Sequence, residues 1–196
     1  MNRGIGAKRF LIGTLASKQF AIVLMLFALL GMTACADYAK RSTGTTLDDQ
    51  TLEYAVSSAI YSDPSFSQHD HIKVEVNSGV VLLAGETISG ANKDKATRIA
   101  EQQSLTKRVV NDLVIGERAG LGDKTNNAWL TGKVNSVLLK ENPLPGNDAS
   151  RIKVISSQGT VYLMGLVTHK QGDQVAEIVR NIRGVTKVMK IFDYTD

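Results

Sequence analysis

Apolar residues recur at helical spacing once the chain passes Leu47. This spacing predicts an amphipathic helix, and its inward positions are Leu52, Val56, Ala59 and Ile60. Asp48 or Asp49 is predicted to cap the start of the helix, because a short carboxylate can accept the free backbone N–H groups there. Pro64 is predicted to end it, because proline removes a donor and blocks the next turn.

The spacing then changes from helical to alternating. Apolar and polar residues alternate over residues 72–76, residues 77–79 read Asn-Ser-Gly, and residues 81–85 return with apolar side chains. This pattern predicts a β-hairpin. A second helix is expected over residues 91–103 and a closing strand over residues 109–115. The predicted order of elements is αββαβ.

The hairpin pattern repeats eighty residues later in the sequence. Seven positions are shared at this offset: Ile72, Lys73, Val74, Gly79, Val81, Leu83 and Gly85 match Ile152, Lys153, Val154, Gly159, Val161, Leu163 and Gly165. With short gaps the match extends to both sides, so the repeat unit is about seventy residues long. That length is typical of a small domain. Two tandem domains are predicted over residues 47–116 and 124–196, joined by a short linker over residues 117–123.

The second copy predicts the same elements as the first. A helix is expected over residues 126–140, a hairpin that turns at residues 157–159, and a final strand over residues 185–192. Between them lies a second helix with an inward face of Val175, Ile178, Val179 and Ile182. A hairpin, a crossover helix and a third strand predict an α+β fold in which each domain has a small mixed sheet with both helices packed on one face.

Residues 1–34 are typical of a secretory signal of the lipoprotein type. Basic side chains occur up to Lys18, and an apolar run over residues 20–30 precedes small residues and a cysteine. A permanent membrane helix is the alternative, but eleven apolar residues fall short of the roughly 20 that span a bilayer. Residues 35–46 are polar and predict a flexible tether.

Residues 32–35, Met-Thr-Ala-Cys, resemble the lipobox of bacterial lipoproteins, with Met32 where leucine is more usual. The resemblance implies that Cys35, the only cysteine, becomes the first residue of the mature chain and carries acyl chains such as palmitate. It also implies sorting to the outer membrane, because Ala36 is not the aspartate that is associated with retention in the inner membrane. The resemblance implies three acyl chains at Cys35, and because two membrane signals already suffice for stable anchoring, such a protein stays attached.

The net charge of +4 does not indicate a nucleic-acid-binding protein. Four basic side chains lie in residues 1–34, and the remainder has 19 basic and 19 acidic groups. The charge is instead distributed between the copies, at −4 over residues 47–116 and +4 over residues 124–196. The second copy is therefore the expected partner of an anion.

Two αββαβ copies, recurring hairpin glycines, Val-Asn-Asp-Leu at residues 110–113 and the lipobox together resemble the BON-domain family. Within it they are similar to dual-BON outer-membrane lipoproteins. The second copy departs from the pattern with Val-Met-Lys-Ile at residues 188–191. The resemblance implies a non-enzymatic protein without a cofactor, facing the periplasm, that binds phospholipid or partner surfaces, supports envelope integrity and acts at the division site.

Candidate catalytic and metal-binding residues are few. His69 and His71 flank Asp70, but without a further ligand they are interpreted as a solvated loop. His169 lies near the start of a helix and is interpreted as a surface residue. No nucleophile, phosphate-binding or zinc-protease motif occurs. No catalytic residue, cofactor or metal site is predicted.

Trp129 is the strongest candidate for a binding residue. On a helical wheel it lies off the stripe of core positions, and the proposed contact surface comprises Trp129, Gly132, Lys133, Ser136, Leu139 and Lys140. An outward tryptophan and leucine beside lysines are typical of a helix that lies on a membrane. The hypothesis is that the second domain binds anionic phospholipid, such as phosphatidylglycerol or cardiolipin.

Two alternatives stay open at this stage. Trp129 could instead pack on the first copy, or it could anchor an envelope protein, which would make the chain a protein-interaction module. The first copy provides a natural control for all three readings. Its matching position is Thr51, and its helix carries Glu53 rather than a flank of lysines.

Overall fold

The computed structural model describes residues 43–117, 120–144 and 151–196. The chain divides into the units Met1–Lys40 and Arg41–Asp196, and every described residue falls in the second. The predicted signal, Cys35 and most of the predicted tether therefore lie outside the described residues.

The first domain contains helix α2 (Thr43–Ser62), strands β1 (His71–Asn77) and β2 (Val80–Thr87), helix α3 (Gly90–Glu101) and strand β3 (Arg108–Ile115). Strands β1 and β2 form an antiparallel hairpin. Because α3 carries the chain back along the sheet, β3 pairs with β2 in parallel. The sheet order is β1-β2-β3.

The second domain repeats this arrangement with helix α4 (Leu121–Glu141), strands β4 (Ile152–Ser157) and β5 (Thr160–Val167), helix α5 (His169–Arg180) and strand β6 (Lys187–Tyr194). The β4–β5 hairpin is antiparallel and the β5–β6 pair is parallel. The predicted fold class, two tandem αββαβ domains with small mixed sheets, is confirmed.

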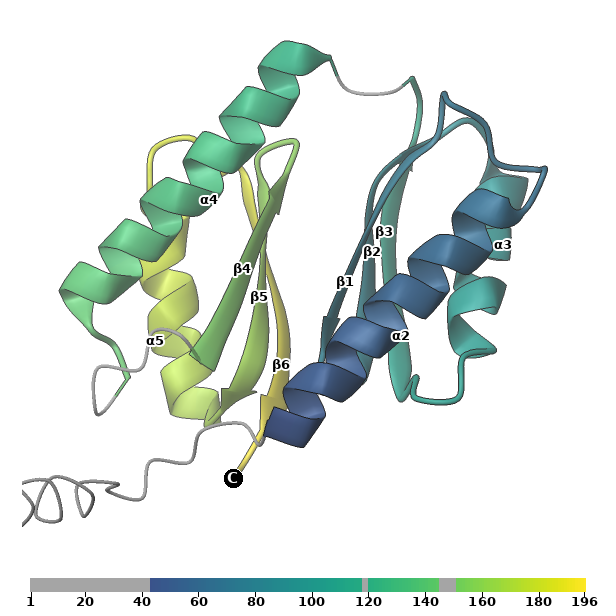
Figure 1. Cartoon of the computed structure of the whole chain (residues 1–196). Helices are drawn as coiled ribbons and strands as arrows, with labels where there is room; N and C mark the ends of the chain where they lie inside the picture. The colour runs from purple at the N-terminus through teal and green to yellow at the C-terminus, as the bar shows by residue number, and fades with distance from the viewer. Residues whose placement is uncertain (1–42, 118–119, 145–150) are drawn as a thin grey trace, which may run out of the picture. The chain divides into compact units, whose positions relative to one another are not determined.

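In each domain both helices cover the same face of the sheet (Figure 1). The first core joins the apolar stripe of α2 and two alanines of α3 to alternate strand residues: Leu52, Val56, Ile60, Ile72, Val74, Val76, Val81, Leu83, Ala96, Ala100 and Leu113. The second core is built in the same way from α4, α5 and their sheet, and includes Leu130, Val134, Leu138, Val154, Val161, Leu163, Val175 and Val179. Most of the predicted inward positions of the helices thus form the cores, but Ala59 is only partly buried and is not part of the first core.

The opposite faces of the two sheets pack on each other. This third cluster contains Val80, Leu82 and Ala84 of the first domain with Ile155, Tyr162, Met164 and Ile191 of the second. Strand β2 is consequently buried along its whole length, which explains its continuous apolar run. The Tyr162 hydroxyl donates to Asp112 Oδ2 at 2.8 Å. Burial, reinforced by this carboxylate, raises the pKa of Tyr162.

The predicted cap of the first helix is wrong. Helix α2 begins at Thr43, so Asp48 and Asp49 lie inside it. Asp49 is only 6% exposed, and its carboxylate accepts the N–H groups of Ser78 and Gly79 at 2.8 and 2.9 Å. The hairpin turn, which places Gly79 at φ +81°, presents these two amides to one acceptor. Asp49 therefore fixes the turn of β1–β2 instead of the start of a helix.

Candidate functional site

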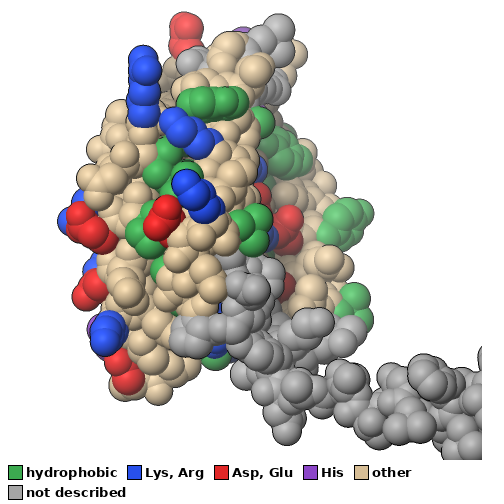
Figure 2. All heavy atoms as spheres, turned by 90° about the vertical axis from the view of Figure 1, so that its left-hand side faces the viewer, with side chains coloured by type: hydrophobic (Ala, Val, Ile, Leu, Met, Phe, Trp, Pro, Cys, Tyr) green, Lys and Arg blue, Asp and Glu red, His purple; other side chains and the backbone are tan. Residues whose placement is uncertain are grey.

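The proposed contact residues lie on the outer side of α4. The helix buries Leu130, Val134 and Leu138 in the core, where they are at most 1% exposed. Trp129 and Leu139 are 54% and 65% exposed. Figure 2 shows the side of the second domain that carries α4, where basic side chains lie beside hydrophobic ones with acidic groups interspersed. We call the residues Trp129, Gly132, Lys133, Ser136, Leu139 and Lys140 the α4 surface.

Trp129 and Lys133 form a single unit on this surface. The Lys133 ammonium lies 4.6 Å from the centre of the indole ring, which is within the range of a cation–π interaction. It also donates to the Arg183 carbonyl oxygen at 2.9 Å. The indole lies beside the turn between α5 and β6, since a Cβ on Gly184 would be 3.6 Å from Trp129 Cζ3. Trp129 is therefore held against its own domain.

This arrangement differs from the alternative in which Trp129 packs on the first domain. The hydrophobic contact between the domains is made by the two sheets and does not include Trp129. Since about half of its side chain is exposed, the indole remains open to a partner.

The other residues of the α4 surface differ in how available they are for contact with a binding partner. Gly132 is open, because a Cβ placed on it would have no neighbour within 4 Å. The Ser136 hydroxyl donates to the Gly132 carbonyl at 2.9 Å and so bonds within the helix. Lys140 is exposed in the last turn. The strongest external contacts available are thus the indole, Leu139 and the two ammonium groups.

Sequence reasoning missed the contribution of the turn between α5 and β6. Arg183 is exposed, and its carbonyl positions Lys133. Fifty residues separate the two along the chain, so helical spacing on α4 could not reveal the contact. The excess of basic residues in the second copy was the available signal, but it did not locate Arg183.

The control position in the first domain has different surroundings. Thr51 is exposed and its hydroxyl donates to the Leu47 carbonyl at 2.9 Å, which keeps it within α2. The outer side of α2 exposes Leu47, Tyr54 and Tyr61 instead. Glu53 is engaged by Lys153 of the second domain at 3.1 Å. The two helices thus present different chemistry at matching positions.

His71 and His169 make local side-chain contacts. His71 Nδ1 lies 3.1 Å from Glu86 Oε2, and the ring of His169 stacks on Tyr194 with the centroids 3.8 Å apart. Asp70 points inward and accepts hydrogen bonds from Thr87 and from the backbone of Ser67. Within the described ranges, no three histidine, cysteine or acidic side chains come together as a metal site.

Burial by itself would raise the pKa of Asp70. The hydrogen bonds from Thr87, from the amides of Ser67 and Ile88 and from Asn92 outweigh burial, so the pKa is lowered. Asp70 therefore stays ionised just before β1, where its hydrogen bonds join the loop that precedes β1 to the end of β2.

None of the helices in the described part of the chain combines the length and the apolar character needed to cross a bilayer.

Comparison with known proteins places these features in a family. The family model of the BON domain matches residues 48–117 and 126–195. The chain is 34% identical over 156 residues to "Outer membrane lipoprotein DolP" of Haemophilus influenzae, covering 80% of this chain and 79% of that protein. It is 32% identical over 154 residues to the "21 kDa hemolysin" of Actinobacillus pleuropneumoniae, covering 79% and 78%.

Among solved structures, the C-terminal domain of CdsD, a structural protein of the type III secretion system of Chlamydia trachomatis, matches 74% of this chain and 98% of its own at 13% identity, with a TM-score of 0.30. A score this low supports no conclusion about function. The family model covers both αββαβ units, and the chain therefore belongs to the BON-domain family and carries two BON domains.

Proposed function

We propose that this protein is a non-enzymatic outer-membrane lipoprotein, anchored through Cys35 and facing the periplasm, whose second BON domain binds anionic phospholipid through the α4 surface. Similarity to a relative named as an outer-membrane lipoprotein supports the location. The lipobox-like residues 32–35 support the anchor. Phosphatidylglycerol and cardiolipin are the proposed lipids, and support of envelope integrity, in part at the division site, is the proposed role.

The single observation that carries the lipid proposal is the pairing of Trp129 with Lys133. The indole is 54% exposed and an ammonium lies 4.6 Å from its ring. Indoles favour the headgroup depth of a bilayer, where an apolar body meets lipid and the N–H meets water. The adjacent ammonium would then lie at the level of the lipid phosphates.

Lys133 remains able to bind a phosphate although it already has a partner. An ammonium carries three donors, and the Arg183 carbonyl accepts one of them. Lys140 and Arg183 add positive charge near the same surface, and each basic side chain near an anionic membrane contributes about 1 kcal/mol. The hydrophobic contacts then add a salt-independent part of the binding.

Vesicle co-sedimentation tests the proposal on the chain from residue 36 onward, which contains the whole unit Arg41–Asp196. We expect binding to vesicles that contain phosphatidylglycerol or cardiolipin, weaker binding as salt is raised, and no binding to purely zwitterionic vesicles. Trp129→Ala should lower the affinity about tenfold or more, and Lys133→Glu about fivefold or more. Thr51→Ala, the matched change in the first domain, should have no effect.

A stability measurement separates lipid contact from packing. Trp129 is about half shielded, so its truncation should cost about 1–2 kcal/mol at most. Leu130→Ala, at the fully buried neighbouring position, should cost about 2–5 kcal/mol. If Trp129→Ala bound anionic vesicles as the parent does, or melted as low as Leu130→Ala, the lipid proposal would be wrong.

A protein-interaction module is the second candidate. The outer side of α2 exposes Leu47, Tyr54 and Tyr61 to 62%, 76% and 52%. These residues recur every seventh position and so share one side of the helix, and tyrosine is enriched in protein interfaces. Failure of the parent chain to bind any vesicle would favour an envelope protein as the partner.

The anchor has an independent test. Cys35→Ser should move the processed protein from the membrane fraction to the soluble fraction without loss of folded structure. A variant that is cleaved, folded and still bound to membrane would rule out anchoring through Cys35, whatever the result for Trp129.

A further inference from the structure

The two domains contribute one lysine each to matching positions of their first strands. Lys73 of β1 and Lys153 of β4 correspond in the repeat. Lys153 contacts Glu53 and Glu75 of the first domain. Lys73 lines a cavity together with Thr131 and Ser156 of the second domain. Each lysine therefore faces the other domain, and the two surroundings can be compared position by position.

Around Lys153, two carboxylates of the first domain meet the ammonium group. Glu53 Oε2 lies 3.1 Å from Lys153 Nζ. The same oxygen accepts the Val76 N–H, on the open edge of β1, at 3.2 Å. Lys153 also reaches Glu75 Oε2 at 2.6 Å and donates to the Val76 carbonyl at 3.2 Å. The ammonium, the edge amide and the carboxylate thus satisfy one another.

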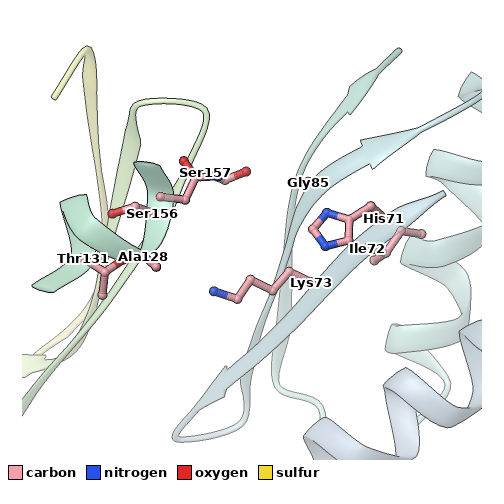
Figure 3. A pocket seen from close by; sticks show the side chains of 9 residues that line it. His71, Ile72, Lys73, Gly85, Ala128, Thr131, Ser156 and Ser157 are labelled. Atoms are coloured by element: carbon pink, nitrogen blue, oxygen red, sulfur yellow. The ribbon is translucent and has the colours of Figure 1, made fainter. Parts of the chain in front are cut away.

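Around Lys73, the carboxylates are replaced. Thr131 is the counterpart of Glu53 on α4, and Ile155 is the counterpart of Glu75 on β4. In place of the ion pairs there is a cavity of about 270 Å³. Figure 3 shows the two sides of this cavity, with Lys73 reaching from β1 towards the second domain. Its polar wall is formed by His71, Lys73, Asn127, Thr131, Ser156 and Ser157. We call it the Lys73 cavity.

The Glu53 carboxylate has no counterpart here, because Thr131 takes its place on α4. Ser156 is the counterpart of Val76. Because Ser157 and Thr160 close the two-residue hairpin, the Ser156 amide points to the open edge of β4. The Ser156 hydroxyl is buried and has no hydrogen-bond partner in the described part of the chain. Lys73 has a loose 3.5 Å pair with Glu75 and a side chain that is 47% exposed.

We propose that the Lys73 cavity binds the carboxylate group of a small polar ligand, which takes the position that the Glu53 carboxylate has in the first domain. The ligand oxygen would accept from the Ser156 amide and pair with the Lys73 ammonium. The buried Ser156 hydroxyl, which has no hydrogen-bond partner in the described part of the chain, could donate to the same ligand. A buried donor without an acceptor is costly, so a carboxylate that satisfies it is stabilised. Hydroxyl and amide side chains on the wall can hydrogen-bond polar groups elsewhere on the ligand, and Ile72 and Ala128 offer apolar contact.

A monoanion is preferred over a dianion because a second negative charge is already nearby. Glu86 is 1% exposed and is bound by His71 and by Gln158 of the second domain, at 3.1 and 2.6 Å. A phosphate monoester with almost two charges would be repelled more strongly than a carboxylate. The proposal does not depend on lipid binding, since Thr131 lines the cavity whereas Trp129 does not.

Propionate is a suitable probe because it is the glutamate side chain cut at Cα. We expect saturable amide chemical-shift changes at Ser156 and Ser157 when propionate is added to the chain from residue 36 onward. Propionamide, which is neutral and of the same shape, should give none. Lys73→Met should weaken propionate binding about tenfold or more.

Two reciprocal variants test the comparison between the domains. Thr131→Glu should supply the carboxylate internally, so that the Ser156 amide no longer responds to propionate. Glu53→Thr should open the matching site and create a new response at the Val76 amide. Absence of a saturable response in the parent chain, or an unchanged response in both Thr131→Glu and Lys73→Met, would overturn the proposal. If Thr131→Glu fails to fold, Lys73→Met decides, because Lys73 is half exposed and its loss leaves the core intact.

Discussion

Replacing Lys153 by methionine should measure how strongly the ionic contact holds the two domains together. Methionine keeps most of the aliphatic stem, so the change removes the charge and the hydrogen bonds more than the packing. The loss leaves Glu75, which is only 16% exposed, without its 2.6 Å partner. Glu53 and the Val76 carbonyl lose contacts of 3.1 and 3.2 Å as well.

The expected cost lies between two limits. Breaking a fully buried ion pair costs about 3–5 kcal/mol, because a charge is left unpaired, while an exposed pair contributes about 0–1 kcal/mol. The Lys153 side chain is 32% exposed, so we expect the free energy of unfolding to fall by about 2 kcal/mol. Lys73→Met is the matched control. Its 3.5 Å pair and 47% exposure predict a loss of about 0.5 kcal/mol or less.

Urea denaturation gives both numbers, provided that the slope of the transition is unchanged. Adding Glu75→Gln to Lys153→Met should cost less than the sum of the single changes, because the pair is already broken. Equal effects of Lys153→Met and Lys73→Met would refute the distinction between a filled and an open site. So would a loss below about 0.5 kcal/mol for Lys153→Met.

The pH dependence of this contact has a definite sign. Burial by itself would lower the pKa of Lys153, but Glu75 and Glu53 outweigh burial and hold it above the ordinary value of 10.5. A raised pKa means that the folded protein retains the proton longer than the unfolded chain. The contribution of Lys153 is therefore complete below pH 10.5 and is lost as the pH rises through the folded-state value. Lys153→Met should lack this loss.

Three further predictions concern stability. Gly165→Ala should cost about 2–4 kcal/mol or prevent folding, because Gly165 has φ +151° and a Cβ there would lie 2.4 Å from the Arg151 carbonyl oxygen; thermal melting compares it with the parent. Gly132→Ala, on the exposed side of α4 where a Cβ meets nothing within 4 Å, should instead stabilise by up to about 1 kcal/mol, and a lower melting temperature would contradict it. Asp70→Asn should cost about 2 kcal/mol at neutral pH. Because the pKa of Asp70 is lowered on folding, this difference should shrink as the pH falls below about 4 in an acid-unfolding series; a constant difference would contradict the assignment.

The sequence determined the elements of each domain because they follow from local periodicity and turn chemistry. The helix stripe of Leu130, Val134 and Leu138 and the alternation in β1 each require only neighbouring residues to be read. The duplication then made each copy a check on the other. The exposed position of Trp129 also followed from the sequence, since a helical wheel separates it from the core stripe.

Tertiary structure decided what the free face of each sheet contacts and which groups meet across it. Alternating strand residues show that a second face exists, but its partner lies on distant chain segments: Lys73 and Thr131 are 58 residues apart, and Glu53 and Lys153 are 100 residues apart. The sequence pattern predicts a cap at Asp49 for the same reason, because its true partners, the amides of the hairpin turn, lie about thirty residues further along. Local spacing fixes the direction of a side chain relative to its own element. Only packing between elements brings an acceptor on one of them to a donor on another.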